Sequence, residues 1–439
     1  MQSRGPPHGT QAATEGLQFS EGAREERKQM ERRRFLTLGA AVAAPYIVRR
    51  EALGANDRIR VGVIGVGNRS GLLIDQLPPE ADLVAVADCY LKRAEEAAAK
   101  RQAKWRIYQS HLELLEQKDI DGVIIGTKEF QRVTPIIDAC KAGKDIYAEK
   151  PLTLYIAEGR ALVRTVNKYS RVLQVGSQQR SMAMNQVACE FIRKGGLGKL
   201  AFVQGVNYAG PRLVVPKYSE DPMPAGLNWD LWLNQLPMRP YSAQLHKSPI
   251  GREFVGGEMT NWGAHGLDQI QCALGMDETG PVELWPQPEG PEGSIAFRYG
   301  NGVTVRLEMP PGNDLVGGGI FVGSKGVLRL VRNGFKTDPP DLIKELPPAE
   351  EVEKWNRAQW QAQYHMQEWL DCMRTRKKPS AHVEIGHRST TVCHLANITR
   401  QLGRRLKWDP EAERFIDDAE ATTFTTRVRR KGFKLPGDI

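Results

Sequence analysis

Residues 59–71, IRVGVIGVGNRSG, constrain the fold of this 439-residue chain more than any other stretch. The run Ile59–Ile64 is rich in β-branched residues, which predicts a buried strand. Gly65, Gly67 and Ser70 follow in the order G-x-G-x-x-S, and a short helix should then end at two prolines. A strand, a glycine turn and a helix start form a pyrophosphate site, because free N–H groups and a partial positive charge gather there.

A second predicted strand supports this interpretation. Leu83–Ala87 ends at Asp88, about 20 residues beyond the glycine turn, where a carboxylate would accept ribose hydroxyls. Asp88 favours NAD, because its charge would repel a 2′-phosphate, whereas Arg69, Lys92 and Arg93 leave NADP open. The alternative is an ordinary strand–turn–helix unit that binds no ligand.

Strands and helices alternate through the first part of the chain. Further strands are expected at 121–126, 145–148 and 172–175, and helices at 91–106, 134–142 and 156–169. This alternation predicts an α/β Rossmann fold, a doubly wound parallel sheet of about six strands, over residues 56–180.

The pattern changes over residues 181–439. Strand-like runs occupy 199–208, 282–285, 294–299, 302–309, 319–322 and 326–331, and helices are expected at 182–194, 355–373 and 385–402. These runs predict an α+β domain with a large, mostly antiparallel, open-faced sheet. Because an exposed apolar sheet face needs cover, we expect a homodimer or homotetramer.

Composition excludes several classes of protein. With 41% hydrophobic and 26% charged residues, the chain is not disordered throughout. The net charge of +9 is too diffuse to indicate nucleic-acid binding. The one dense basic run, Arg427–Lys434, is expected to be a solvated end, with a phosphate-binding arm as the alternative. The six cysteines lack paired spacing, so neither a disulfide framework nor a metal site is predicted.

Residues 1–55 have the composition of a leader. The cluster Arg32–Arg34 precedes an apolar stretch, Phe35–Val48, that is shorter than the roughly 20 residues of a membrane span. The segment resembles a twin-arginine export signal, which carries folded proteins, with cleavage near 41–44 or 54–55. We expect a periplasmic or otherwise exported protein with no stable membrane span after processing. The alternative is a cytoplasmic protein with a disordered N-terminus.

The tripeptide Glu149-Lys150-Pro151 lies where a parallel strand is predicted to end, the edge at which doubly wound sheets bind ligands. Lys150 could donate a hydrogen bond to a substrate hydroxyl and stabilise a developing alkoxide. Pro151 would fix the turn, with a cis bond as one way to do so. The alternative is a solvated Glu–Lys turn.

The stretch 256–275 reads GGEMTNWGAHGLDQIQCALG. A helix from Asn261 would place His265, Asp268 and Gln269 on one face. A histidine held by a neighbour suits a general base near neutral pH. A histidine that caps or fills a helix interior is the alternative.

Three tryptophans, Trp229, Trp232 and Trp262, could stack against sugar rings. Aromatic residues more often fill cores, so core packing is the favoured interpretation.

Together these motifs resemble the glucose–fructose oxidoreductase / inositol dehydrogenase / MocA (Gfo/Idh/MocA) family over about residues 56–439. The resemblance is carried by GVIGVGNRSG (62–71), the acid at 88, AGKDIYAEKP (142–151), VLQVGSQQR (172–180), LNWDLWL (227–233), GGEMTNWGAHGLDQIQ (256–271) and VEIGHRS (383–389). It implies a two-domain enzyme that acts on sugars or polyols with NAD or NADP.

The resemblance also implies site residues. Lys150 and His265 match the lysine and histidine that work on the substrate hydroxyl as hydride leaves its carbon. Expected cofactor contacts are Gly65, Gly67, Asn68, Arg69, Ser70, Asp88, Thr127, Glu149 and Lys150. Expected substrate contacts are Gln179, Arg180, Asn261 and Asp268.

Two departures from the family pattern stand out. Asn261 replaces an aspartate, and a neutral amide cannot stabilise a protonated histidine. Asp268 is therefore a candidate substitute partner for His265. The stretch TKEFQRV (127–133) replaces the common T-P-x-x-x-H and adds Lys128 and Arg132 near the cofactor.

The function expected from these features is an exported sugar or polyol oxidoreductase with a tightly bound, internally recycled cofactor, since a periplasm supplies no pool to reoxidise a released dinucleotide. Two alternatives stay open. One is an NAD-dependent, redox-neutral glycoside hydrolase, and the other is a sugar-binding relative that has lost catalysis.

Overall fold

The computed structural model describes residues 58–437, except 216, 289, 291–292, 313 and 359–361. The predicted export signal and its cleavage points lie outside the described residues. None of the helices described is long and apolar enough to cross a membrane.

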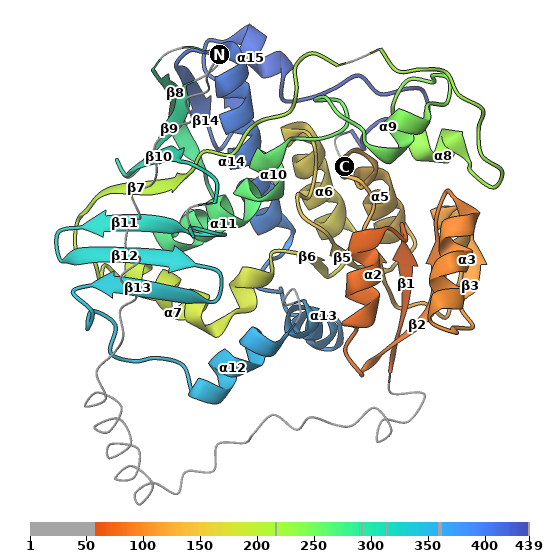
Figure 1. Ribbon diagram of the computed structural model, residues 1–439, viewed down its shortest axis with the longest axis horizontal. Helices are drawn as coiled ribbons and strands as arrows, with labels where there is room; N and C mark the ends of the chain where they lie inside the picture. The colour runs from red at the N-terminus through yellow and green to blue at the C-terminus, as the bar shows by residue number, and fades with distance from the viewer. Residues whose placement is uncertain are drawn as a thin grey trace, which may run out of the picture. The chain divides into compact units, whose positions relative to one another are not determined.

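Six parallel strands form the first sheet, in the order β3-β2-β1-β4-β5-β6 (Figure 1). They are β1 (Ile59–Ile64), β2 (Ala81–Ala87), β3 (Arg106–Tyr108), β4 (Gly122–Ile125), β5 (Asp145–Ala148) and β6 (Leu173–Val175). β1 lies between β2 and β4, and its apolar side chains are buried on both faces. The order reverses there, which is where such sheets bind ligands. The predicted doubly wound sheet is confirmed.

Helices cover both faces of this sheet. They are α2 (Asn68–Asp75), α3 (Leu91–Lys100), α4 (His111–Leu115), α5 (Val133–Lys141) and α6 (Ile156–Lys168). The helix expected over 91–106 ends early, because Gln102 adopts a left-handed conformation (φ 51°) and the next residues join the sheet as β3. Two 3₁₀ turns, η4 (Glu129–Gln131) and η5 (Gln178–Ser181), follow β4 and β6.

The second sheet has the order β13-β12-β11-β7-β10-β9-β8-β14-β15. Its strands are β7 (Leu200–Val206), β8 (Pro281–Gln287), β9 (Ser294–Tyr299), β10 (Thr304–Met309), β11 (Gly319–Gly323), β12 (Gly326–Val331), β13 (Gly334–Asp338), β14 (Leu406–Asp409) and β15 (Arg414–Phe415). All the described pairings are antiparallel except β10 with β7. The predicted large, mostly antiparallel sheet is confirmed, although β13, β14 and β15 were not predicted.

One face of the second sheet packs on helices α7 (Ala183–Arg193), α11 (Gly263–Leu274) and α14 (Val383–Leu402), which share a core with its buried side chains. The other face carries the exposed Arg306 and Glu308 and the partly buried Phe202 and Ile320. α14 also contacts α6 and β6, so it joins the two sheets.

The remaining helices are α8 (Trp229–Leu233), α9 (Ala243–Lys247), α10 (Glu258–Asn261), α12 (Ala349–Arg357), α13 (Gln363–Thr375) and α15 (Ala419–Thr423). The single helix expected over 355–373 was wrong, since α12 and α13 are separate. α13 packs against the first sheet, where Trp369 meets Tyr147 edge to face.

The basic run near the C-terminus is not a solvated end, which corrects the sequence-based expectation. Arg427 and Arg429 both form ion pairs with Glu158 of α6, at 2.8 and 2.5 Å, and Arg430 pairs with Asp230. Glu158 is only 1% exposed, and a buried carboxylate needs cationic partners.

Candidate active site

The glycine turn is tightly packed on one side and open on the other. Gly65 has φ +81°, and a Cβ there would meet Thr127 at 2.8 Å. A Cβ on Gly126 would lie 2.0 Å from Ser70 Oγ, so the helix start and β4 approach as the motif requires. By contrast, a Cβ on Gly67 would meet nothing within 4 Å. The open side, at the start of α2, leaves room for the phosphates of a dinucleotide.

A cavity of about 600 Å³ borders this turn and is lined by Gly65, Gly67, Asn68 and Asp88, among others. Asp88 is 5% exposed. Its carboxylate accepts hydrogen bonds from the backbone N–H groups of Val66 (2.8 Å) and Tyr90 (2.9 Å), which fix its direction. This is the placement expected for an acid that contacts the adenosine ribose.

Of the three basic residues that leave NADP open, Arg69 lines the cavity and pairs with Glu149 at 2.8 Å. Arg93 lines the cavity, with its guanidinium 3.4 Å from the Asp88 carboxylate. Lys92 does not line it and lies 4.0 Å from Glu96 on the surface of α3.

A second cavity, of about 800 Å³, adjoins the first and shares Arg69, Gly126, Thr127 and Lys128 with it. Lys150 and His265, the two predicted catalytic residues, both line this second cavity. Lys150 follows the carboxyl end of β5, and its bond to Pro151 is cis, as suggested from the sequence. His265 comes from α11, so two elements far apart in the chain meet at the cavity.

Lys150 is held by Asn261 at the end of α10. Its Nζ donates to both the backbone carbonyl and the side-chain Oδ1 of Asn261, each at 2.9 Å. This leaves one of the three N–H groups with no partner among the described residues, available to a substrate oxygen. Burial lowers the pKa of Lys150, while the carboxylates of Glu149 and Glu129 oppose that change.

His265 is 8% exposed and lines the cavity beside Trp262, with the two ring centres 6.0 Å apart. Burial, reinforced by the positive charges of Lys150, Arg332 and Arg69, holds the pKa of His265 well below its ordinary 6.5. The imidazole is therefore neutral at physiological pH and can accept a proton.

Glu149 is the buried anion of this site. Arg69 Nε donates to its Oε1 at 2.8 Å, and Gln178 lies 3.5 Å from the same oxygen. Burial raises the pKa of Glu149, but the positive charges of Arg69, Lys150 and Arg132 outweigh that and bring the pKa below its usual value. Glu149 therefore stays ionised and ties α2 to the end of β5.

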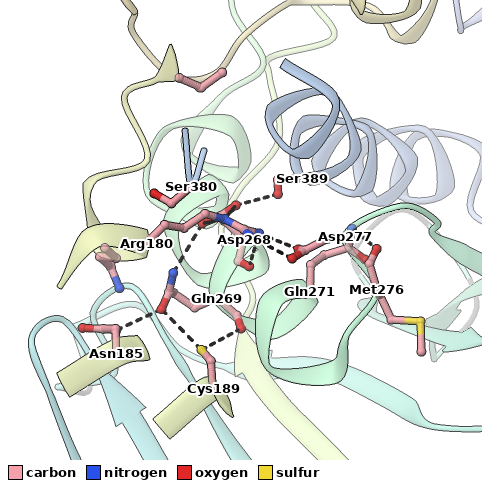
Figure 2. Close-up of polar contacts among 12 residues, drawn as sticks. Arg180, Asn185, Cys189, Asp268, Gln269, Gln271, Met276, Asp277, Ser380 and Ser389 are labelled. Atoms are coloured by element: carbon pink, nitrogen blue, oxygen red, sulfur yellow. Dashed lines mark hydrogen bonds and ion pairs between the residues drawn. The ribbon is translucent and has the colours of Figure 1, made fainter. Parts of the chain in front are cut away.

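Three predicted substrate contacts lie elsewhere, and two of them, Arg180 and Asp268, belong to the buried network shown in Figure 2. Arg180 Nε binds the carboxylate of Asp268 at 2.8 Å, and its NH2 group binds Asp277, also at 2.8 Å. Ser389 of α14 donates to Asp268 at 2.7 Å. Gln179 donates to a backbone carbonyl. None of Gln179, Arg180 and Asp268 lines either cavity.

This network corrects the suggested partnership between Asp268 and His265. The Asp268 carboxylate is engaged by Arg180, and no described residue is hydrogen-bonded to the His265 ring. Of the predicted substrate contacts, Asn261 alone reaches the cavity, and its side chain holds Lys150.

Several cavity residues were not assigned by sequence reasoning. Gln178 precedes the predicted Gln179 by one position, Glu129 lies in η4, and Arg332 lies in the turn between β12 and β13. For Glu129 there was a signal in the sequence, because the stretch 127–133 departs from the family pattern. Nothing local in the sequence marks Arg332, because a hairpin arginine is ordinarily a solvated surface residue.

Two of the three tryptophans pack in a core, and the third lines the cavity, where a sugar ring could stack. Trp229 and Trp232 stack on each other with ring centres 4.4 Å apart in a buried aromatic cluster, as favoured. Trp262 is partly buried against the core and also forms part of the cavity wall.

Comparison with known proteins identifies the class. A family profile described as "Oxidoreductase family, NAD-binding Rossmann fold" matches residues 59–177, and one described as "Oxidoreductase family, C-terminal alpha/beta domain" matches residues 205–435. The chain therefore belongs to the Gfo/Idh/MocA oxidoreductases, NAD-dependent enzymes built from these two domains.

Among curated relatives, scyllo-inositol 2-dehydrogenase (NAD(+)) of Bacillus subtilis is 30% identical over 344 residues, covering 73% of this chain and 88% of that protein. Inositol 2-dehydrogenase of Rubrobacter xylanophilus is 28% identical over 156 residues, covering 35% of this chain and 44% of that protein. That second match spans less than half the length of the relative.

Solved structures share the fold. The WlbA dehydrogenase of Bordetella pertussis, solved with NADH and UDP-GlcNAcA, has a TM-score of 0.60 at 18% identity and covers 81% of this chain and 99% of its own. Aldose-aldose oxidoreductase of Caulobacter crescentus, solved with glycerol, has a TM-score of 0.55 at 17% identity. The match covers 80% of this chain and 99% of that protein's chain.

Proposed function

We propose that the chain interconverts a hydroxyl and a carbonyl on a sugar or polyol, with NAD as hydride carrier and with Lys150 and His265 as the groups that handle the proton. One observation carries this proposal: the two residues line a single cavity that adjoins the dinucleotide cavity. The neutral imidazole of His265 accepts the hydroxyl proton, and Lys150 donates a hydrogen bond to the oxygen as negative charge develops. The nicotinamide, when bound, supplies the hydride acceptor.

The substrate class rests on the relatives and on the cavity. The B. subtilis and R. xylanophilus relatives are named for inositols, which are polyols. The cavity combines donors and acceptors with one aromatic wall, Trp262, which suits a polyhydroxylated ring.

A direct test is to purify the protein, load it with NAD and follow nicotinamide absorbance with a panel of inositols and aldoses. Turnover that His265→Asn lowers by about 10²- to 10⁴-fold, with NAD still bound, would support the proposal. The absence of any absorbance change with every sugar, with NAD bound, would overturn it.

The position of Asn261 bears on the alternative of a non-catalytic sugar-binding protein. The main support for that alternative is Asn261 itself, a neutral amide where the family pattern has an aspartate. Asn261 nevertheless holds the Lys150 Nζ with two hydrogen bonds, which is a role in positioning that needs no charge. The catalytic proposal is therefore preferred, and unchanged ligand recovered after long incubation would favour the alternative.

We also propose that the protein is exported by the twin-arginine route and keeps its cofactor through a closed redox cycle. The support is the arginine pair and apolar stretch of residues 32–48. Fractionation of cells that express the full chain tests export, and replacing Arg32 and Arg33 by Lys should retain the protein inside. Release of free sugar from a synthetic glycoside, with no net change in NAD, would instead select the redox-neutral hydrolase.

The open face of the second sheet supports the proposal of a homodimer or homotetramer. Phe202, Ile320 and Val322 are only partly buried there. A single molar mass equal to that of the monomer in light scattering would refute it.

A further inference from the structure

A segment far along the chain forms part of the cofactor cavity. Most of the lining residues lie between positions 64 and 135, in the Rossmann fold. The others belong to residues 226–247, which include α8 and α9, and they are Leu231, Trp232, Asn234, His246 and Lys247. This segment, here named the strap, contains the motif LNWDLWL (227–233), to which the proposed function gives no role.

The strap begins on the wall of the cavity that follows β2. The carbonyl of Gly226 accepts hydrogen bonds from the backbone N–H of Leu91 and from Nε2 of Gln109, each at 3.0 Å. The backbone N–H of Asn228 donates to the carbonyl of Cys89 at 2.8 Å. These bonds fix the start of the strap beside the acid that is expected to contact the adenosine ribose.

The strap is fixed again on the opposite wall, which η4 and α5 form. Gln131 Nε2 donates to the carbonyl of Trp232 at 2.5 Å, and Gln235 Nε2 donates to the carbonyl of Phe130, also at 2.5 Å. β1 and its glycine turn lie between β2 on one side and β4, which precedes η4, on the other. The strap therefore crosses the cofactor cavity from one wall to the other.

Asn234, which directly follows α8, is held at three of its four polar groups. Its backbone N–H donates to the carbonyl of Asp230 at 3.0 Å, and its carbonyl accepts from Arg430 Nε at 2.5 Å. Its side-chain Oδ1 accepts from Thr134 Oγ1 and from the backbone N–H of Gln235, each at 2.9 Å. Because a backbone N–H can only donate, the atom that faces it must be the amide oxygen, which settles the direction of the amide.

The remaining group, Nδ2 of Asn234, has no hydrogen-bond partner among the described residues. The residue lines the cofactor cavity and is 5% exposed. Its backbone has φ 54° and ψ −121°, a conformation that residues other than glycine rarely adopt and that costs conformational energy. A strained asparagine that is held this firmly, with one donor left at a cavity, is suited to bind an oxygen of the ligand in that cavity.

We propose that the strap holds NAD in its cavity and that Asn234 donates a hydrogen bond from Nδ2 to an oxygen of the dinucleotide, either a ribose hydroxyl or a phosphate. Since the bonds on both walls must break before the strap can move away, it should also slow the release of NAD. Slow release is what the proposed recycling of the cofactor requires, and in that respect alone the inference rests on the proposed function.

The experiment measures binding and does not depend on turnover. NAD and ADP-ribose, which lacks the nicotinamide, are titrated by calorimetry into purified protein freed of nucleotide, and the release of bound NAD into excess ADP-ribose is timed. Asn234→Gly should bind both nucleotides about tenfold more weakly and release NAD faster, because the donor is lost. Its melting temperature without nucleotide should be unchanged or higher, because glycine adopts this backbone conformation with less strain.

Two further variants control for folding. Asn234→Asp keeps the side-chain oxygen that Thr134 and Gln235 bind but loses the donor and adds a charge, so NAD should bind at least tenfold more weakly. Asn333→Gly is the matched control, because Asn333 also has φ 54° but lines neither cavity, and it should leave NAD binding unchanged.

NAD binding within threefold of the wild type in Asn234→Gly or in Asn234→Asp would overturn the inference. So would an equal loss in Asn333→Gly, which would show a general effect of loosening the backbone. Failure of the wild type to turn over any sugar would overturn the proposed function and leave this inference standing, because nucleotide binding is measured without a sugar.

Discussion

The replacement Asn261→Asp tests how this site sets the protonation of its two catalytic groups. Lys150 Nζ lies 2.9 Å from Asn261 Oδ1, so the variant places a negative charge next to the ammonium. Two unit charges at this distance attract by about 6 kcal/mol at an effective dielectric constant of about 20, which is an upper bound. Since the new carboxylate must also lose water, a net gain of about 2 kcal/mol is more realistic, comparable to a hydrogen bond between charged groups.

This stabilisation of the Lys150 ammonium should shift the pH profile of activity in a known direction. Lys150 must be protonated to donate, and its pKa lies below the ordinary value, so activity should fall on the alkaline side before pH 10.5. His265 must be neutral, and its pKa lies well below 6.5, so activity should persist into mildly acidic solution. A carboxylate at position 261 favours the protonated form of Lys150 and the protonated form of His265. At about 1.4 kcal/mol per tenfold change in proton affinity, the alkaline limb should move upward by about one pH unit, and the acidic limb upward as well.

The assay is kcat/KM across pH with the preferred sugar, for the wild type and the variant. Asn261→Leu is the matched control, because it removes the side-chain hydrogen bond without adding charge. It should lower the rate and leave the alkaline limb where it is or move it down. If the limbs of the pH profile do not move in Asn261→Asp, or if they move to lower pH, this account of how the pKa values of Lys150 and His265 are set is refuted.

Four further substitutions separate cofactor binding and cofactor choice from folding. Gly67→Ala should weaken NAD binding about tenfold at an unchanged melting temperature, since a Cβ there meets nothing within 4 Å. Gly126→Ala should lower the melting temperature, because its Cβ would lie 2.0 Å from a hydroxyl oxygen. The reverse pattern in NAD titration and thermal unfolding would be inconsistent with the structure. Asp268→Ala should lower the free energy of unfolding in urea by about 3 kcal/mol, because Arg180 keeps its ion pair with Asp277 but loses the one with Asp268. A raised KM in the folded variant would instead place Asp268 at the substrate. Asp88→Ser should raise kcat/KM with NADP relative to NAD at least tenfold, and no change would remove this carboxylate from cofactor selection.

The first sheet and the glycine turn were predictable because their determinants are local. The β-branched run 59–64 favours a strand wherever it lies, and the glycines that follow leave few alternatives for the turn. Lys150 could likewise be placed at a strand end from its neighbours. Its meeting with His265 required the family resemblance, since no local pattern relates β5 to α11.

Other features depend on contacts between distant segments. The helix periodicity that put Asp268 near His265 could not show that Arg180, from η5, would take up that carboxylate. Arg332 reaches the cavity only because β12 and β13 pair at the edge of the second sheet. The basic C-terminal run binds Glu158, which sequence patterns leave without a partner.

The central claim is that Lys150 and His265 act on one substrate hydroxyl beside the nicotinamide. Single-turnover reduction of bound NAD by the preferred sugar tests it most directly, in the wild type, in His265→Asn and in Lys150→Met. The account predicts that both variants keep NAD bound and reduce it about 10²- to 10⁴-fold more slowly. Reduction at the wild-type rate in either variant would contradict it.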